Sequence, residues 1–206
     1  MVVIGICGLN GSGKGMTAQL LKNKGFISYS TSDILREECF KKGIAEITRD
    51  HLFAEGVRMR KLYGTDVLVQ RVLERIYAEE GAALKRREPL RGKYVIESIR
   101  NPGEVQFLRT IPSFSLWSID ADAQTRFFRL KARRREEDSQ TFEDFLRVEQ
   151  LENKRDPAGQ QGLVTSGLAD VHIVNDGTIE ELDKAVKEKL DLLMGSSSSP
   201  QATGKK

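Results

Sequence analysis

A glycine-rich segment near the start of the chain carries the residues whose chemistry is clearest. Residues 8–15 read Gly-Leu-Asn-Gly-Ser-Gly-Lys-Gly and directly follow the apolar run Val2–Cys7. Glycines let several backbone N–H groups converge on one anion, and a helix beginning near Lys14 adds the positive end of its dipole. The Lys14 ammonium reaches the outer phosphates of a nucleotide as a flexible point charge. The segment therefore predicts a phosphate-binding loop, with a ligand-free glycine turn as the alternative.

The residue after Lys14 departs from the common form of such loops. That position usually holds Ser or Thr, whose hydroxyl meets Mg²⁺, whereas this chain has Gly15 followed by Met16 and Thr17. Gly-Ser-Gly-Lys-Gly instead resembles the loop of adenylate kinases and related nucleoside monophosphate kinases. The resemblance implies ATP as phosphoryl donor with Mg²⁺, held through water by Thr17 or by an acidic residue. The ATP-binding residues expected here are Asn10, Gly11, Ser12, Gly13, Lys14, Gly15 and Met16.

A second motif concerns the molecule that would accept the phosphoryl group. Residues 30–36, Ser-Thr-Ser-Asp-Ile-Leu-Arg, are similar to the adenylate kinase segment Ser-Thr-Gly-Asp-Met-Leu-Arg that lines the monophosphate site. The resemblance implies that Thr31 and Asp33 lie at the acceptor and that Arg36 holds its phosphate. A guanidinium suits this task because it offers two parallel donors to a phosphate dianion. The alternative is a helix cap at Ser32 or Asp33, with Arg36 in solvent.

The third expected strand ends in Glu97-Ser98-Ile99-Arg100, which places a charged pair at its carboxyl end. Nucleoside monophosphate kinases commonly have Asp-Gly-Phe-Pro-Arg or Asp-Gly-Ile-Arg at this point. The resemblance implies that Glu97 acts near Mg²⁺, although its arm is one methylene longer than that of the family's aspartate. It also implies that Arg100 is a second arginine that binds the acceptor phosphate.

A basic segment follows the fourth expected strand. The arginines at mostly helical spacing are Arg126, Arg129, Arg133, Arg134 and Arg135. In nucleoside monophosphate kinases this position leads into a lid, so the resemblance implies that Arg129, Arg133 and Arg134 close over the transferring phosphoryl group. Such donors neutralise charge on its equatorial oxygens, and closure excludes water. The alternatives are a solvated helix or a nucleic-acid patch, and the acidic run at 136–138 argues against nucleic acid.

A segment near the carboxyl end completes the resemblance. Ala169-Asp170-Val171 and Asn175-Asp176-Gly177-Thr178 resemble a segment of dephospho-CoA kinases whose backbone lies against the adenine of ATP. Asn175 is therefore an expected ATP contact. The acceptor motif of those kinases, Asp-x-Asp, is absent at residues 30–36. Over about residues 1–194 the chain thus resembles a nucleoside monophosphate kinase-like P-loop kinase, with dephospho-CoA kinase as a cousin.

Alternating strands and helices must bring these motifs together. We expect strands at Val2–Cys7, Phe26–Ser30, Tyr94–Ile96, Phe114–Ile119 and Val171–Val174. We expect helices at Met16–Lys24, 32–42, Thr48–Met59, Asp66–Glu79, Glu104–Leu108, Gln124 to about Lys154, and Ile179–Met194, with loops at Gly81–Gly92 and Pro157–Gly167. This alternation predicts an α/β, three-layer P-loop NTPase fold: a five-stranded parallel sheet with helices on both faces, a helical acceptor-binding insert and a short lid. Ligands of such sheets gather at the carboxyl ends of the strands.

The composition fits one folded domain without a membrane partner. The 206 residues are 39% hydrophobic and 31% charged, with a net charge of +3, which is too small to indicate nucleic-acid binding. No apolar run approaches the roughly 18 residues of a membrane helix, and the first strand leaves no room for a signal peptide. We therefore expect a cytoplasmic protein. Its expected parts are a kinase domain at 1–194, an acceptor-binding region at about 31–92, a lid region at about 126–157 and a disordered tail at 195–206.

These motifs lead to one functional hypothesis and several alternatives. The hypothesis is in-line transfer of the γ-phosphoryl group of ATP to a nucleoside or deoxynucleoside monophosphate, with Lys14, Arg100 and Arg133 as catalytic residues. The alternatives are a non-catalytic nucleotide-binding interaction protein, a kinase of dephospho-CoA, and a kinase of a nucleotide within nucleic acid. A GTP-hydrolysing switch is not expected, because the Asn-Lys-Arg-Asp run at 153–156 follows a charged helical segment rather than a buried strand. The acceptor's base and sugar are not predicted.

Overall fold

A five-stranded parallel sheet forms the centre of the molecule in a computed structural model that describes residues 1–133, 141–153 and 156–195. Its strands are β1 (Val2–Cys7), β2 (Ile27–Ser30), β3 (Lys93–Glu97), β4 (Phe114–Asp120) and β5 (Val171–Val174). Their order is β2-β3-β1-β4-β5, and every neighbouring pair is parallel. All carboxyl ends therefore meet at one edge. The expected fold is confirmed, and each strand differs from its expected bounds by at most one residue at either end.

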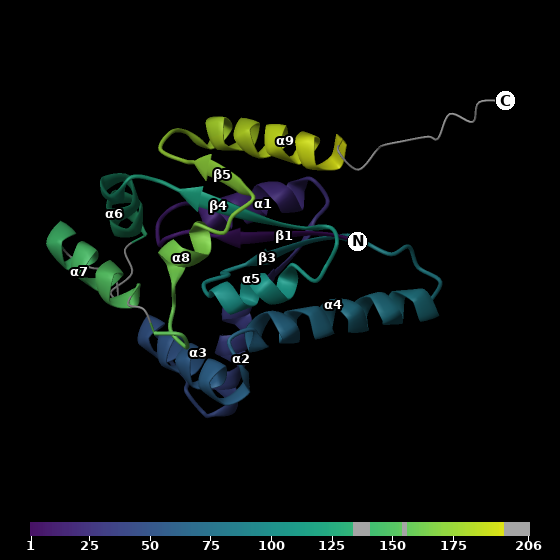
Figure 1. The fold of residues 1–206 in the computed structure, drawn as a ribbon, viewed down its shortest axis with the longest axis horizontal. Helices are drawn as coiled ribbons and strands as arrows, with labels where there is room; N and C mark the ends of the chain where they lie inside the picture. Colours follow the sequence, from purple (N-terminus) through teal and green to yellow (C-terminus); the bar gives the residue numbers. More distant parts are fainter. Residues whose placement is uncertain (134–140, 154–155, 196–206) are drawn as a thin grey trace.

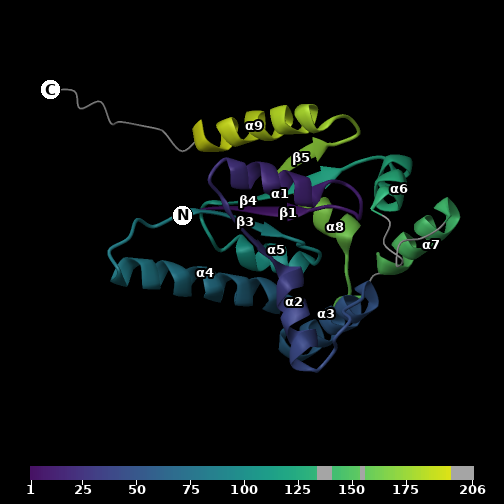
Figure 2. The ribbon, with the colours of Figure 1, turned by 180° about the vertical axis from the view of Figure 1, so that it is seen from behind.

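The two faces of the sheet are covered by different helices (Figures 1 and 2). Side chains alternate along β1, so Ile4 and Ile6 pack against α1 (Lys14–Asn23) and α9 (Ile179–Gly195). Val3 and Cys7 belong to the opposite core, which α4 (Val67–Lys85) and α5 (Pro102–Leu108) help to fill. Because both faces of the sheet are covered, the central strand β1 is an almost continuous apolar run, whereas the edge strands β2 and β5 are only partly buried. No helix of the described ranges is both long and apolar enough to span a bilayer.

The helices after β2 form the insert expected for the acceptor. They are α2 (Thr31–Lys41) and α3 (Arg49–Tyr63), which lie beyond the end of α4 in Figure 1. The cap of α2 is Ser30, whose hydroxyl accepts a hydrogen bond from the N–H of Ser32 at 3.2 Å, so the expected cap at residue 32 or 33 was wrong. The expected loop Gly81–Gly92 was wrong in its first part, since α4 continues to Lys85. Ala82, Ala83 and Leu84 are strong helix formers, and they carry the helix past Gly81.

The expected lid region contains two helices where the sequence predicted one. They are α6 (Ala123–Ala132) and α7 (Phe142–Glu152), whereas residues 134–140 and Lys154 lie outside the described ranges. The ring centroid of Phe127 lies 5.6 Å from that of Phe142 and 5.8 Å from that of Phe145, so aromatic packing holds the two helices together. The expected loop Pro157–Gly167 contains the short helix α8 (Gly162–Ser166). Of the expected tail, Gly195 closes α9 and residues 196–206 lie outside the described ranges.

Candidate functional site: a phosphate loop facing an arginine-lined cavity

Three glycines give the loop between β1 and α1 a shape that other residues would not adopt. Gly8, Gly11 and Gly13 have φ values of 136°, 80° and 102°. A Cβ on Gly8 would lie 2.1 Å from the carbonyl oxygen of Ile119, and a Cβ on Gly13 would lie 2.2 Å from Nδ2 of Asn175. Positive φ and close neighbours together explain why these positions are glycine. The helix α1 begins directly at Lys14, so its free N–H groups face the loop as an anion-binding end.

The position and the pKa of Lys14 suit the binding of a phosphate. Its Nζ donates to the carbonyl oxygen of Leu9 at 2.7 Å, which closes the loop around the ammonium. Burial, and after it the nearby positive charges of Arg100, Arg133 and Arg126, lower the pKa of Lys14 to about 7. The negative charge of a phosphate at this position would raise that pKa again. The lysine is therefore poised to exchange the Leu9 carbonyl for a ligand oxygen.

Ser12 and Asn175 bear on the expected ATP site in different ways. The Ser12 hydroxyl is fully buried and has no hydrogen-bond partner among the described residues, a cost that a ligand's oxygen would remove. Asn175 Nδ2 donates to the carbonyl oxygen of Ser12 at 2.8 Å, so this residue supports the loop from behind. Asn10, Gly15 and Met16 also lie where expected, and Gly15 and Met16 are exposed at the start of α1. Contact of these residues with ATP stays a prediction.

The residues expected at the acceptor site surround the ends of β2 and β3. The Thr31 hydroxyl is buried and donates to the carbonyl oxygen of Ser98 at 2.8 Å. Asp33 and Arg36 form an exposed ion pair one helical turn apart, with an N–O distance of 2.8 Å. Such a pair in solvent is worth about 0–1 kcal/mol, so Arg36 is readily available to another anion.

Arg100 lies at the carboxyl end of β3 with its charge only partly satisfied. Its guanidinium donates to Oε1 of Gln160 at 2.6 Å, a neutral partner. Burial lowers the pKa of Arg100 from its ordinary value, and the negative charge of Glu152 is the largest influence in the opposite direction. The backbone N–H of Arg100 donates to Glu104 on α5 at 2.8 Å, which fixes the residue at the strand end.

The structure separates the arginines expected in the lid. Arg126, the first arginine of the basic segment, is buried, ion-paired with Glu149 of α7 and 5.2 Å from the ring centroid of Phe145. Arg129 donates to the carbonyl oxygens of Asn175 at 2.7 Å and of Gly177. Both therefore hold α6 against its surroundings.

Arg133 alone of the described lid arginines reaches the space where an acceptor would bind. It lines the cavity that Arg36 and Arg100 also line. Arg134 lies outside the described residues, so its expected place in the lid stays a prediction.

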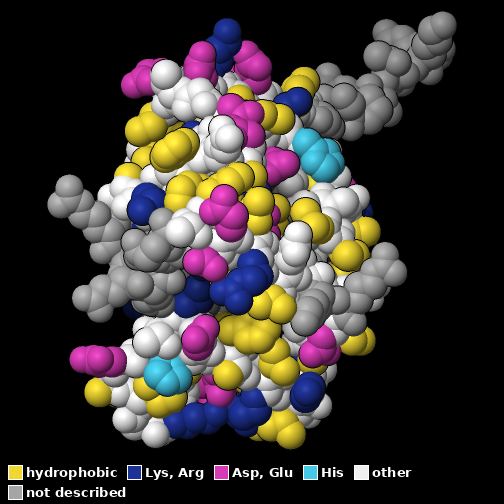
Figure 3. Space-filling view, turned by 90° about the vertical axis from the view of Figure 1, so that its left-hand side faces the viewer, with side chains coloured by type: hydrophobic (Ala, Val, Ile, Leu, Met, Phe, Trp, Pro, Cys, Tyr) yellow, Lys and Arg dark blue, Asp and Glu magenta, His cyan; other side chains and the backbone are white. Residues whose placement is uncertain are grey.

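The cavity between the loop and the helical insert has a volume of about 170 Å³. One water needs only about 10–15 Å³ measured in this way, so the cavity admits part of a small molecule. Its lining consists of Asn10, Thr31, Ser32, Leu35, Arg36, Ile47, Arg49, Leu52, Gly56, Arg60, Ser98, Arg100, Leu130, Arg133 and Gln160. Five of these are arginines and none is acidic. Lys and Arg side chains gather near the centre of the face that carries α6 and α7 (Figure 3).

The charge balance of this cavity favours an anionic ligand. Arg36, Arg49 and Arg60 have carboxylate partners, which are Asp33, Glu152 and Glu104. Within the described part of the chain, Arg100 and Arg133 have none. Several cations near one another without matching anions are costly in the free protein, and the binding of a phosphate or carboxylate relieves that cost.

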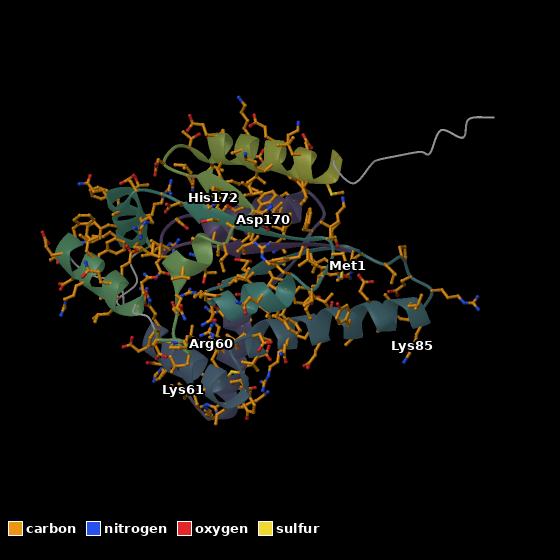
Figure 4. All side chains as sticks on the ribbon, in the orientation of Figure 1. Met1, Arg60, Lys61, Lys85, Asp170 and His172 are labelled. Carbon is orange, nitrogen blue, oxygen red and sulfur yellow. The ribbon has the colours of Figure 1, made fainter. Side chains whose placement is uncertain are left out.

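Five polar lining residues were not among the predicted site residues: Ser32, Arg49, Arg60, Ser98 and Gln160. Arg60 is buried and donates to Oε1 of Glu104 at 2.8 Å, while its buried Nε has no hydrogen-bond partner among the described residues. Its neighbour Lys61 is exposed, and both are labelled on α3 in Figure 4. The one available signal was the spacing of Gly56 and Arg60, which places both on the same face of a helix. Ser98 has a φ of 64°, a left-handed conformation that favours glycine, and the Asp-Gly-Ile-Arg motif that residues 97–100 resemble has glycine at this position.

The donor set near the loop bears on how Mg²⁺ would be held. Among the described residues no three His, Cys, Asp or Glu side chains converge. Thr17 is buried and its hydroxyl donates to the carbonyl oxygen of Gly13 at 3.3 Å, a contact that uses its proton and not its lone pairs, so its contact with Mg²⁺ through water stays a prediction. Glu97 accepts from Ser28 at 2.6 Å, and its charge interacts with those of Asp33 and Lys14. Since Mg²⁺ bound to phosphates keeps several waters, Glu97 fits a contact made through water.

The fold and the loop define the class of protein. Among solved structures, the chain is similar to the shikimate kinase of Bacteroides thetaiotaomicron, with a TM-score of 0.58, 15% identity, and 94% of this chain and 98% of that chain covered. The shikimate kinase of Aquifex aeolicus gives a TM-score of 0.54 at 16% identity, with 95% and 98% covered. At such identities the likeness concerns the fold alone. The fold is that of the P-loop kinases.

Sequence comparison gives the family. Residues 7–147 match the family model described as an AAA domain. A UPF0200 protein of Methanothermobacter thermautotrophicus is 34% identical over 191 residues, which cover 92% of this chain and 90% of the relative. A UPF0200 protein of Thermococcus kodakarensis is 32% identical, with 93% and 97% covered. The chain belongs to the UPF0200 family and contains an AAA domain.

Proposed function

We propose that the protein transfers the γ-phosphoryl group of ATP to a nucleoside or deoxynucleoside monophosphate, giving ADP and a nucleoside diphosphate. The observation that carries the proposal is the arginine-lined cavity beside the phosphate loop. Asn10 belongs to the loop and also lines the cavity, so a donor in the loop and an acceptor in the cavity would be neighbours. Five arginines and no acid on its wall suit an acceptor that is itself a phosphate.

Each charged residue has a separate part in this proposal. Lys14 leaves the carbonyl of Leu9 and binds the outer phosphates of ATP. Arg36 exchanges the exposed carboxylate of Asp33 for the acceptor phosphate, and Arg100 binds the same group from the strand end. Arg133 also lines the cavity and neutralises charge on the group in transit. Mg²⁺, when bound, supplies further neutralisation of the phosphate oxygens, and Glu97 is the residue that would hold it through water.

This chemistry needs positioning more than it needs proton transfer. Phosphoryl transfer passes through a loose transition state in which donor and acceptor oxygens must be aligned. An acceptor phosphate at neutral pH carries no proton that a base must remove first. The arginines therefore account for the catalytic groups, and no general base is proposed.

The test is the release of ADP from ATP with a panel of ribo- and deoxyribonucleoside monophosphates. The panel also contains dephospho-CoA, a 5′-phosphorylated oligonucleotide, and shikimate, because shikimate kinases share the fold. We expect release with at least one monophosphate and none with shikimate, which has no phosphate for the arginines. Release with none of the phosphorylated acceptors would overturn the kinase assignment and leave a nucleotide-binding protein.

A pair of lysine variants tests the proposed donor site. Lys14→Met removes the ammonium inside the loop, whereas Lys22→Met removes an exposed ammonium from the same helix. We expect Lys14→Met to abolish ADP release while Lys22→Met retains it. Full activity in Lys14→Met would show that the loop is not the donor site. The cytoplasmic address and the division into an acceptor-binding region and a lid region are part of this proposal.

A further inference from the structure

Glu152 joins three parts of the site through one carboxylate. It lies in the last turn of α7, and its Oε2 accepts from the guanidinium of Arg49 at 2.6 Å and from Nδ2 of Asn10 at 3.1 Å. Arg49 is the first residue of α3 and lines the acceptor cavity. Asn10 belongs to the phosphate loop. The carboxylate thus connects the lid region, the acceptor-binding insert and the loop at a single point.

The position of this carboxylate is one that a phosphate would also favour. Glu152 lines a small cavity together with Asn10, Arg100 and Gln160, and these three residues also line the acceptor cavity. The pKa of Arg100 shows that the two charges interact, because Glu152 is the largest influence that stabilises the Arg100 guanidinium. A carboxylate and a phosphate make the same charge-assisted hydrogen bonds with guanidinium groups.

We propose that Glu152 is an internal competitor for the acceptor phosphate: in the free protein its carboxylate holds Arg49 and Asn10, and the acceptor phosphate takes its place. Arg49 is thereby an acceptor-binding residue and Glu152 a residue that sets the affinity and charge preference of the site. That the displacing group is an acceptor phosphate rests on the proposed function. That a bound anion displaces Glu152 from Arg49 does not depend on it.

The geometry makes the exchange feasible without unfolding α7. The side chains of Arg49 and Glu152 are 30% and 15% exposed, so water reaches their ion pair and lowers the cost of breaking it. Glu149, one turn earlier on α7, is paired with the buried Arg126, which is 5% exposed and keeps the helix anchored on α6. A phosphate dianion carries more charge than a carboxylate and has more acceptor oxygens. It therefore displaces Glu152 from Arg49 while the Arg126 pair stays in place.

The proposal is tested by the binding of inorganic phosphate, measured by isothermal titration calorimetry without ATP. Glu152→Gln removes the competing charge and keeps the shape of the side chain. Glu143→Gln makes the same change at an exposed position of the same helix. We expect phosphate to bind Glu152→Gln about tenfold more tightly than the wild type, because an opposing charge beside the site is gone. We expect Glu143→Gln to stay within about twofold.

A double-mutant cycle with Arg49→Gln shows whether the tighter phosphate binding of Glu152→Gln depends on Arg49. In the Arg49→Gln background, Glu152→Gln should improve phosphate binding by no more than about twofold, because the residue that it liberates is missing. Unchanged or weaker phosphate binding by Glu152→Gln would overturn the proposal. If Glu152→Gln tightened phosphate binding equally with and without Arg49, the proposal would also be overturned. The gain would then come from the loss of a negative charge near the phosphate loop and not from the release of Arg49.

Two further measurements distinguish the exchange at Arg49 from a merely structural role of Glu152. They also distinguish a failure of this proposal from a failure of the proposed function. Glu152→Asp keeps the charge on a shorter arm that no longer reaches Arg49, so it should give an intermediate gain and unfold at the wild-type temperature. In the ADP-release assay, Glu152→Gln should lower KM for the monophosphate and leave KM for ATP unchanged. A merely structural role predicts loss of kcat instead and counts against the proposal. Tighter phosphate binding without ADP release in the whole panel would support the exchange and overturn the proposed function.

Discussion

The side-chain amide of Asn175 donates a 2.8 Å hydrogen bond to the carbonyl oxygen of Ser12, joining residues 163 positions apart. Asn175 follows the edge strand β5, and its own carbonyl oxygen accepts from Arg129 of α6 at 2.7 Å. Its Nδ2 also occupies the space that a side chain on Gly13 would need. The shape of the phosphate loop therefore depends on a contact from the far end of the chain.

Replacing Asn175 with Asp should weaken both the fold and nucleotide binding. The change keeps the size of the side chain but places a carboxylate against the Ser12 carbonyl oxygen, where no donor remains. We expect the free energy of unfolding in urea to fall by about 1–3 kcal/mol, the cost of a buried unsatisfied polar group. We expect ATP affinity, measured by calorimetry, to fall by at least about tenfold, because the new charge lies beside the phosphate loop. Asn23→Asp, the same change at an exposed position of α1, should alter neither quantity.

The pKa of Lys14 predicts that ATP binding takes up protons near pH 7.5. Burial and neighbouring arginines lower the pKa of this lysine to about 7, so much of it is neutral in the free protein. Bound phosphates favour the charged form and raise the pKa, which draws a proton from the buffer. Calorimetric titration in two buffers of different ionisation enthalpy should show this uptake. Lys14→Met should remove it, and a wild-type binding enthalpy independent of buffer would contradict the prediction.

The same pKa sets how stability depends on pH in the free protein. The ordinary pKa of lysine is 10.5, so between pH about 7 and 10.5 the unfolded chain holds a proton at Lys14 that the folded chain lacks. This residue therefore makes the free energy of unfolding rise with pH across that window, and below it the full cost of burying the charge applies. Lys14→Met should accordingly raise the melting temperature of the ligand-free protein at pH 7 more than at pH 10. An equal shift at both values would show that the gain comes from packing alone.

Local sequence patterns were enough to predict the sheet and the loop. The central strands β1 and β3 contain short apolar runs because both faces of the sheet are buried there, and such runs are visible without knowledge of their partners. The glycines of residues 8–13 are set by backbone conformation, which also acts locally. The same holds for Thr31 and Arg100, which directly follow β2 or lie within three residues of the end of β3.

The sequence patterns did not predict the contacts between residues that are far apart in the chain. Arg126, Arg129 and Arg133 share helical spacing, yet Arg126 is paired with Glu149, Arg129 holds the turn after β5, and Arg133 lines the cavity. Spacing along one helix does not say what packs against it. Arg49 fell within the acceptor-binding region expected at about 31–92 but was given no role of its own, since its significance arises from a carboxylate on α7, 103 positions away.

Replacing Ser98 with glycine should stabilise the protein. The φ of 64° at Ser98 places a residue with a Cβ in the left-handed region, which costs about 1–2 kcal/mol. Glycine removes that strain but adds about 0.5–1 kcal/mol of backbone entropy to the unfolded chain. We therefore expect Ser98→Gly to raise the free energy of unfolding by about 0.5–1 kcal/mol, measured by urea denaturation. Ser32→Gly, in the first turn of α2, should lower it by a similar amount. Destabilisation by Ser98→Gly would show that the weak contact of its hydroxyl with Ser30 at 3.4 Å outweighs the strain.

Alanine at Gly13 and at Gly15 should have opposite effects, although the two positions flank the same lysine. A Cβ on Gly13 would collide with Asn175 and is strained by a φ of 102°, so Gly13→Ala should cost about 1–3 kcal/mol of stability. Gly15 lies inside α1 with nothing within 4 Å of an added Cβ. Gly15→Ala should therefore raise the free energy of unfolding by about 0.5–1 kcal/mol. ATP should raise the melting temperature of Gly15→Ala as it does that of the wild type, and should leave Gly13→Ala unchanged. A folded Gly15→Ala that no longer responds to ATP would mean that the nucleotide itself lies against this position, so that glycine is required there by the ligand rather than by the fold.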